Sequence, residues 1–338
     1  MYLAMRSIGL HTFCSAKGGV GKSALAVACA KLLARSGRDV VLIDADMTGT
    51  SLADGLDLCA PAVAPDPRGG YSFEVAPTRH LTRAETWHAR YARAVAMMVD
   101  DDGAPRPPPP FLNDLLIGAL DEDPEVPVAS MLWRHEREDG VGYLPSSPIT
   151  ADLVVAARWL NHDEGERWVR QLAWLLDLLV AQRPTLRDVV FDLPPGLFGF
   201  AAHTIALCSH LAAEEGVKVQ PEGFPRLERH EARWALDPVL VTSQDRNDLS
   251  VAVEWYVRHR ADVPTLRLVA NRLSRPVDDL RHRAKSTLDA LGLQGNVPIE
   301  GVGFLPDSLG AIFNRSHDLD LSREVQDLAA VLRVEVPR

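Results

Sequence analysis

Cysteine is scarce in this chain of 338 residues, and lysine is hardly more common. The four cysteines are Cys14, Cys29, Cys59 and Cys208, and no two have the C-x-x-C spacing. This argues against a zinc or iron–sulfur site built on that motif. Cys14 and Cys29 fall on a predicted buried strand and helix, where a small apolar role is expected. The cysteine usage therefore indicates a reducing, cytoplasmic compartment.

Long hydrophobic runs are absent as well. No stretch of 18 apolar residues occurs, so the sequence predicts no transmembrane helix. Residues 1–10 lack the basic segment and the apolar segment of a signal peptide. The formal net charge is −10, which argues against a generally cationic nucleic-acid binder. Arginine is abundant, so a local basic face stays open.

What the chain does have is a regular alternation of apolar runs and helical stretches. Residues 38–46 and 187–192 are near-continuous apolar runs that end in aspartate, as in parallel strands buried on both faces. The alternation predicts an α/β fold with a mostly parallel, doubly wound sheet of about seven strands in a single domain over 1–338. The expected strands are 8–14, 38–46, 142–145, 187–192, 238–242, 266–270 and 301–305. The expected helices are 23–35, 166–182, 199–213, 246–260, 277–291 and 321–332.

Two segments depart from that rhythm and are predicted to be surface insertions. The first, about 60–110, contains spaced prolines, a helical piece Thr82–Val99 and the run Pro107–Pro110, which favours a stiff spacer. The second, 214–236, is predicted to be a loop with a charged helix. Trp87 and Tyr91 share a face of the first helical piece. Packing on the parent domain and docking of a partner both stay open for that face.

A glycine-rich loop between the first strand and the first helix organises the sequence. Residues 11–23 read His-Thr-Phe-Cys-Ser-Ala-Lys-Gly-Gly-Val-Gly-Lys-Ser. Glycines let successive backbone N–H groups converge on an anion, and the helix start adds partial positive charge. In such a phosphate-binding loop Lys22 would reach the phosphates and Ser23 would bind Mg²⁺. The predicted nucleotide-binding residues of the loop are Gly18, Gly19, Val20, Gly21, Lys22, Ser23 and Ala24.

Other polar residues stand at the ends of separate predicted strands. Asp44 and Asp46 end one strand, Asp192 ends another and Asn271 ends a third. In sheets of this type, ligands bind beyond the carboxyl ends of the strands. We therefore expect these side chains to gather around the glycine loop, where phosphoryl transfer needs a phosphate cradle, a divalent ion and a positioned water.

The run Lys17-Gly-Gly-Val-Gly-Lys-Ser23 resembles the deviant P-loop of the ParA/MinD family of dimerising ATPases. Ala16 stands where a general P-loop has its first glycine, and two of the five lysines of the chain lie in this loop. The resemblance implies a three-layer P-loop NTPase fold. It also implies that Lys17 reaches across a dimer to the nucleotide of the partner subunit. Lys17, Lys22 and Asp46 would be the catalytic residues.

The resemblance assigns roles to further residues. Asp192 resembles the aspartate of the family's D-x-x-G switch and would hold Mg²⁺ together with Ser23 and Asp46. Asp46 would also orient the attacking water, while Asp44 would support the site from behind. Gly196 would approach the γ-phosphate. Asn271 resembles the asparagine that reads adenine, and Pro306 lies in a segment that resembles the one wrapping the base. No guanine-specific signature is present, so ATP is the expected nucleotide.

Members of this family use slow ATP hydrolysis as a dimer clock that positions or partitions cargo, plasmids or chromosomes among them. This implies an ATP-dependent homodimer that is released by a protein partner. Nonspecific DNA binding by the arginines of 272–285 and a merely solvated helix both stay open. The C-terminal stretch 321–338 has mixed charge, which argues against membrane insertion. Two alternatives remain: an ATPase of the same fold that regulates a multiprotein assembly through a partner on 60–110, and a metabolic or metal-carrier enzyme.

Overall fold

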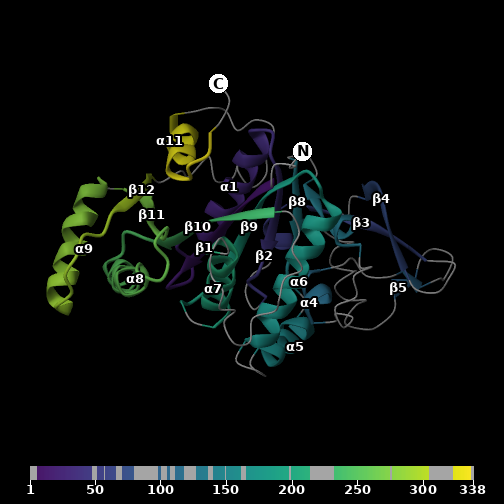
Figure 1. Cartoon of the computed structure of the whole chain (residues 1–338), viewed down its shortest axis with the longest axis horizontal. Helices are drawn as coiled ribbons and strands as arrows, with labels where there is room; N and C mark the ends of the chain where they lie inside the picture. The colour runs from purple at the N-terminus through teal and green to yellow at the C-terminus, as the bar shows by residue number, and fades with distance from the viewer. Residues whose placement is uncertain are drawn as a thin grey trace.

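A seven-stranded parallel sheet forms the body of the protein, which we describe from a computed structural model (Figure 1). The sheet order is β12-β11-β10-β1-β9-β2-β8. The strands are β1 (Arg6–Ser15), β2 (Asp39–Asp44), β8 (Val141–Leu144), β9 (Leu186–Pro195), β10 (Ala232–Thr242), β11 (Arg267–Leu273) and β12 (Ile299–Gly303). The structure describes residues 6–47, 52–56, 58–65, 71–79, 98–99, 105–106, 111–117, 127–135, 140–148, 150–160, 165–197, 199–213, 232–274, 276–303 and 323–335.

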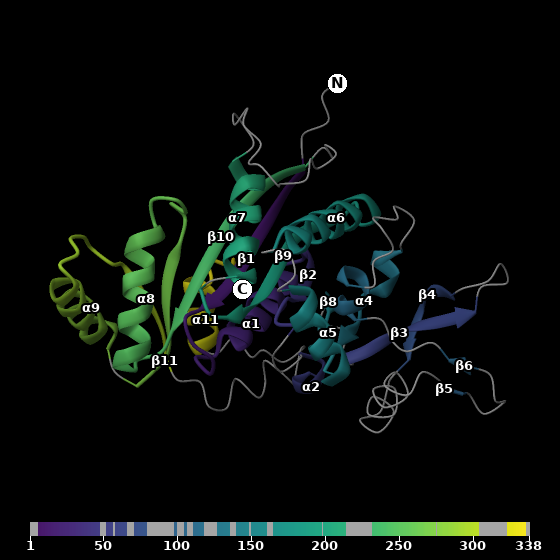
Figure 2. The ribbon, with the colours of Figure 1, turned by 90° about the horizontal axis from the view of Figure 1, so that it is seen from below.

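Helices cover both faces of the sheet and bury two apolar clusters (Figures 1 and 2). On one face, α1 (Lys22–Arg35) and α11 (Arg323–Val331) pack against side chains such as Phe13 and Val190. On the other face lie α5 (Thr150–Leu160), α6 (Glu166–Gln182), α7 (Phe200–Ala213), α8 (Arg246–His259) and α9 (Val277–Leu291). The result is a three-layer, doubly wound α/β fold. The predicted fold class is confirmed.

Six predicted helices and seven predicted strands appear within a few residues of their expected bounds, except that β10 begins six residues before its expected start. Leu305, the predicted end of the last strand, lies outside the described residues. The helix α5 was missed. Among the described residues, no helix is both long and apolar enough to span a bilayer.

The first predicted insertion begins with paired strands, which the sequence did not predict. β3 (Leu58–Pro65) pairs antiparallel with β4 (Tyr71–Arg79) and with the short β7 (Arg134–His135). Pro61 and Pro65 are thus part of a strand. This second sheet extends from the β8 side of the body (Figure 2). The short elements α2 (Leu52–Gly55), α4 (Leu112–Leu116) and the 3-10 helix η1 (Val128–Met131) lie in the same part of the sequence.

Parts of both predicted insertions need correction. Met98–Val99 form β5, paired with β6 (Pro105–Arg106), so the predicted helix does not extend to Val99. Most of that helix, 82–97, and the proline run 107–110 lie outside the described residues. Residues 232–236, assigned to the second insertion, belong to β10, because they pair in parallel register with the start of β1. The rest of that insertion, 214–231, also lies outside the described residues.

Candidate functional site

The glycine loop follows β1 directly and leads into α1, as its sequence predicts. Gly19 and Gly21 have φ angles of 81° and 84°, in the left-handed region that favours glycine. Gly21 is also the N-cap of α1, and no side chain of the described residues caps this helix. The amides of the first helical turn therefore point from the loop without a capping partner, which suits an anion.

Lys22, Ser23 and Asp192 come together beside this loop. The buried Lys22 ammonium forms an ion pair with Oδ1 of Asp192 and lies 3.4 Å from Oγ of Ser23. Asp192 lies near the end of β9, the neighbour of β1 in the sheet. A hydroxyl and a carboxylate next to one ammonium are hard oxygen ligands of the kind Mg²⁺ takes in phosphate sites. The residues present thus fit the expected ion.

Asp44 is a fully buried carboxylate that ties two strand ends together. Its Oδ2 accepts hydrogen bonds from the amide of Leu52 at 2.9 Å and from Oγ of Ser146 at 2.8 Å. Burial first, and then the negative charge of Asp192, raise the pKa of Asp44 to about 7. The Asp44 oxygens already accept hydrogen bonds from backbone amides and a hydroxyl, and a supporting role behind the site stays a prediction. Sequence reasoning missed Ser146, although serine directly after a short buried strand was a usable signal.

Asp46 contacts Asp44, and Gly196 contacts the residue that precedes the glycine loop. The amide of Asp46 donates to Oδ1 of Asp44 at 3.3 Å, and the Asp46 side chain is half-buried. Gly196, with a φ of 102°, donates its amide to the carbonyl of Ser15 at 2.8 Å, so the segment after Asp192 touches the start of the glycine loop. Three residues separate Asp192 from Gly196, one more than in D-x-x-G.

Lys17 pairs with a different carboxylate from Lys22, also within its own chain. Its Nζ lies 3.0 Å from Oδ1 of Asp248, in the first turn of α8, while 46% of the Lys17 side chain stays exposed. Burial alone would raise the pKa of Asp248, but hydrogen bonds from Ser243 and Lys17 hold it below its usual value. Asp248 was missed, because nothing local in the sequence links it to the distant glycine loop.

Asn271 holds the glycine loop from the end of β11. Its Nδ2 donates to the carbonyl of Val20 at 3.0 Å, and its Oδ1 accepts the amide of Arg272 at 2.9 Å. Arg272 has a φ of 58° and donates to the carbonyl of Gly19 at 3.0 Å. Both ends of the Asn271 amide thus have partners within the protein, and its reading of adenine stays a prediction. Pro306 lies outside the described residues.

Two of the predicted strand-end residues contact the glycine loop directly: Asp192 pairs with Lys22, and Asn271 donates to the carbonyl of Val20. A family model described as the CobQ/CobB/MinD/ParA nucleotide binding domain (CbiA) matches residues 11–317. The chain belongs to this family. The expected kinship with ParA and MinD is confirmed. The described core of this nucleotide-binding domain is the sheet that carries the loop and the strand-end residues.

Several solved structures are similar to this chain at low sequence identity. A structural-genomics protein of Corynebacterium diphtheriae is 15% identical, with 96% of this chain and 97% of that chain covered and a TM-score of 0.50. A putative plasmid partition protein of Borrelia burgdorferi B31, bound to AMPPNP, is 13% identical, with 97% and 98% covered and a TM-score of 0.49. The MinC:MinD cell division protein complex of Aquifex aeolicus is 14% identical, with 98% of each chain covered and a TM-score of 0.46. A search of curated protein sequences gives no match.

Proposed function

We propose that this chain is a Mg²⁺–ATP-dependent dimerising ATPase that acts as a switch to position or partition cargo. The observation that carries the proposal is the pair of lysines in one loop. Lys22 is buried beside Ser23 and Asp192, whereas Lys17 is half-exposed and pairs with Asp248. One lysine suits the chain's own nucleotide, and the second suits a nucleotide held by another copy. The whole chain would be a single P-loop ATPase domain with surface insertions.

Each residue then has a role in phosphoryl transfer. The loop amides and Lys22 hold the phosphates and neutralise their charge. Ser23 and Asp192, with Asp46, would hold Mg²⁺, which supplies further charge neutralisation when bound. Asp46 orients the attacking water, and Gly196 offers its backbone to the γ-phosphate. Asp44 keeps the loop after β2 in place through Leu52 and Ser146.

Dimer formation requires Lys17 to change partner. In this structure its ammonium pairs with Asp248 of the same chain. A half-exposed ion pair contributes roughly 1 kcal/mol or less, so the phosphates of a second subunit can replace Asp248 at little cost. Lys17 would then act on the partner's nucleotide like an arginine finger.

Nucleotide binding and phosphate release test this proposal directly. Mg²⁺–ATP affinity is measured by calorimetry and turnover by phosphate release, for the wild type, Lys22→Ala and Lys31→Ala. Lys31 is a buried lysine of α1 outside the loop and serves as the control. We expect Lys22→Ala to lose at least about tenfold in affinity because the cradle loses its central cation. Equal ATP affinity of Lys22→Ala and the wild type would contradict the proposal.

A second candidate is an ATPase of the same fold that regulates a multiprotein assembly through a protein partner. The sheet β4-β3-β7 favours it, because it stands beside the main sheet rather than within it (Figure 2). An antiparallel sheet of this kind offers an edge that a partner strand can extend. Under this candidate, deleting 66–70 at the β3–β4 connection would abolish partner binding but leave ATP binding unchanged. Binding of duplex DNA or of lipid vesicles by the ATP-bound form would favour the cargo-positioning switch instead.

A further inference from the structure

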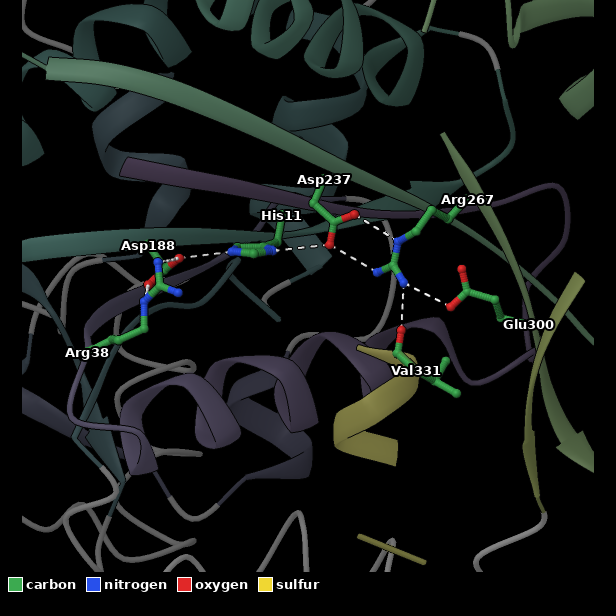
Figure 3. Close-up of polar contacts among 7 residues, drawn as sticks. All are labelled: His11, Arg38, Asp188, Asp237, Arg267, Glu300 and Val331. Atoms are coloured by element: carbon green, nitrogen blue, oxygen red, sulfur yellow. Dashed lines mark hydrogen bonds and ion pairs between the residues drawn. The ribbon is translucent and has the colours of Figure 1, made fainter. Parts of the chain in front are cut away.

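A chain of alternating charges crosses the sheet on the face covered by α1 and α11 (Figure 3). At its centre, Nε2 of His11 on β1 lies 2.9 Å from Oδ1 of Asp188 on β9, and Nδ1 lies 3.6 Å from Oδ2 of Asp237 on β10. On the far side of Asp188 from His11, Arg38 pairs with the same carboxylate, and its Nη2 lies 2.7 Å from Oδ1. The arrangement explains why a histidine interrupts the apolar run of β1.

Arg267 on β11 continues the chain beyond Asp237. Its guanidinium donates to both carboxylate oxygens of Asp237, at 2.8 and 3.0 Å. The remaining nitrogen donates to Oε2 of Glu300 on β12 at 3.1 Å and to the carbonyl of Val331 on α11 at 2.6 Å. One buried side chain therefore connects three elements of the fold, and we call the full set, from Arg38 to Glu300, the basal network.

The basal network lies on the same strands and the same face as the nucleotide site. His11 precedes Ser15 by four residues on β1, Asp188 precedes Asp192 by four on β9, and Arg267 precedes Asn271 by four on β11. Strand side chains alternate between faces, so residues four apart point to the same side, about 13 Å from one another. An apolar layer that includes Phe13, Val190, Val239 and Val269 separates the two polar layers.

The proton on His11 decides whether the charges alternate. When His11 is an imidazolium, both ring nitrogens carry a proton and each N–H faces a carboxylate. Positive and negative groups then alternate from Arg38 to Arg333, whose Nη2 lies 3.3 Å from Oε1 of Glu300. A neutral ring has one N–H and leaves the other carboxylate facing a lone pair. Burial works against the charged ring, but hydrogen bonds and charge from Asp188 and Asp237 raise the pKa of His11 above its usual value.

The other charged or titratable groups on this face do not reverse that balance. Helix α1 places the buried thiol of Cys29 near the network, and burial, followed by Asp237 and Asp188, raises the pKa of that thiol, so it stays neutral. Lys31 is a further buried side chain of α1. From α11 the network receives the carbonyl of Val331, and from the residues after it the exposed Arg333.

We propose that the basal network is a positioning device for the nucleotide site, in which His11, as an imidazolium, fixes β1, β9 and β10 relative to one another. The inference rests on the proposed function, since the site is taken to bind Mg²⁺–ATP. Strands locked at one end present Ser15, Asp192 and the glycine loop in one arrangement at the other end. His11 is thus a positioning residue that touches no nucleotide.

The test compares His11→Gln with Thr12→Val in the full chain. Thr12 is the next residue of β1 and is fully buried on the opposite face, whereas 13% of the His11 side chain is exposed; the Thr12 hydroxyl has no hydrogen-bond partner among the described residues. Mg²⁺–ATP affinity is measured from pH 6 to 10. We expect His11→Gln to weaken binding about tenfold at pH 7, and the wild type to lose affinity above pH 6.5 in a step that His11→Gln lacks. Thr12→Val should follow the wild type.

Hydrogen exchange gives a second readout that needs no nucleotide. The amide of Gly196, bonded to the carbonyl of Ser15, reports on the β1–β9 end of the site. Its exchange should be at least about tenfold faster in His11→Gln than in Thr12→Val when both remain folded. A lower urea midpoint with unchanged affinity, pH profile and exchange would reduce the network to a stabilising role and overturn the inference. If the wild type fails to bind Mg²⁺–ATP, the proposed function fails, and exchange at Gly196 alone decides on the network.

Discussion

Adding one methyl group at each of three loop glycines separates backbone strain from steric conflict. At Gly18 a Cβ would meet no atom within 4 Å, and the backbone is not left-handed. At Gly19 the space is equally open, but the φ of 81° is unfavourable for alanine. At Gly21 the φ is 84°, and a Cβ would collide with Nδ2 of Asn271. Alanine therefore meets neither strain nor steric conflict at Gly18, backbone strain alone at Gly19, and both at Gly21.

The magnitudes follow from general values. Left-handed backbone costs a non-glycine residue about 1–2 kcal/mol, and forcing an extra carbon into a packed site costs about 1–3 kcal/mol. Alanine also stiffens the unfolded chain, which returns about 0.4–1 kcal/mol. We therefore expect Gly18→Ala to be neutral or slightly stabilising, Gly19→Ala to cost about 1 kcal/mol and Gly21→Ala about 2–4 kcal/mol.

Urea unfolding followed by tryptophan fluorescence measures these free energies of unfolding. The double variant Gly21→Ala with Asn271→Ala should recover the steric part, about 1–3 kcal/mol relative to the two single changes added together. A cost of Gly21→Ala no larger than that of Gly19→Ala would refute the close contact between Asn271 and the loop. It would also remove the argument that β11 holds the loop in place.

Three further changes test other contacts. Arg267→Met breaks a buried ion pair and should lower the free energy of unfolding by about 3 kcal/mol. Arg333 is 62% exposed, so Arg333→Met should lower it by less than about 1 kcal/mol. Urea unfolding compares the two variants, and equal losses would contradict the basal network. Asp248→Asn removes the carboxylate that pairs with Lys17. Size-exclusion chromatography at limiting Mg²⁺–ATP should therefore show more dimer than for the wild type. Less dimer would show that Asp248 assists dimer formation. The raised pKa of His11 implies stability that is complete below pH 6.5 and lost as pH rises through the folded value, so the wild-type urea midpoint should fall in that range while that of His11→Gln does not.

Local sequence patterns were enough for the main sheet and the glycine loop. Strands buried on both faces are continuous apolar runs, and β2 and β9 appear where those runs were read. The loop glycines with φ near 80° lie where the phosphate-binding pattern requires them. Hydrophobic period and glycine placement are local properties, so a single sequence carries them.

Contacts between distant segments were beyond local reasoning. Nothing near Lys17 in the sequence indicates Asp248, and nothing near Asn271 indicates that it binds the carbonyl of Val20 instead of standing free. His11 looked like an interruption of a strand until the register placed Asp188 and Asp237 on either side. Such pairings depend on strand order, which the alternation of strands and helices leaves undetermined.

Solution mass measured by light scattering tests the central claim most directly. The wild type, Asp46→Ala and Lys17→Ala are compared with Mg²⁺–ATP and with ADP. We expect a dimer only with ATP, a persistent dimer for Asp46→Ala because binding survives while water positioning is lost, and a monomer for Lys17→Ala. A mass that never responds to nucleotide would contradict the action of Lys17 across a dimer, and with it the switch.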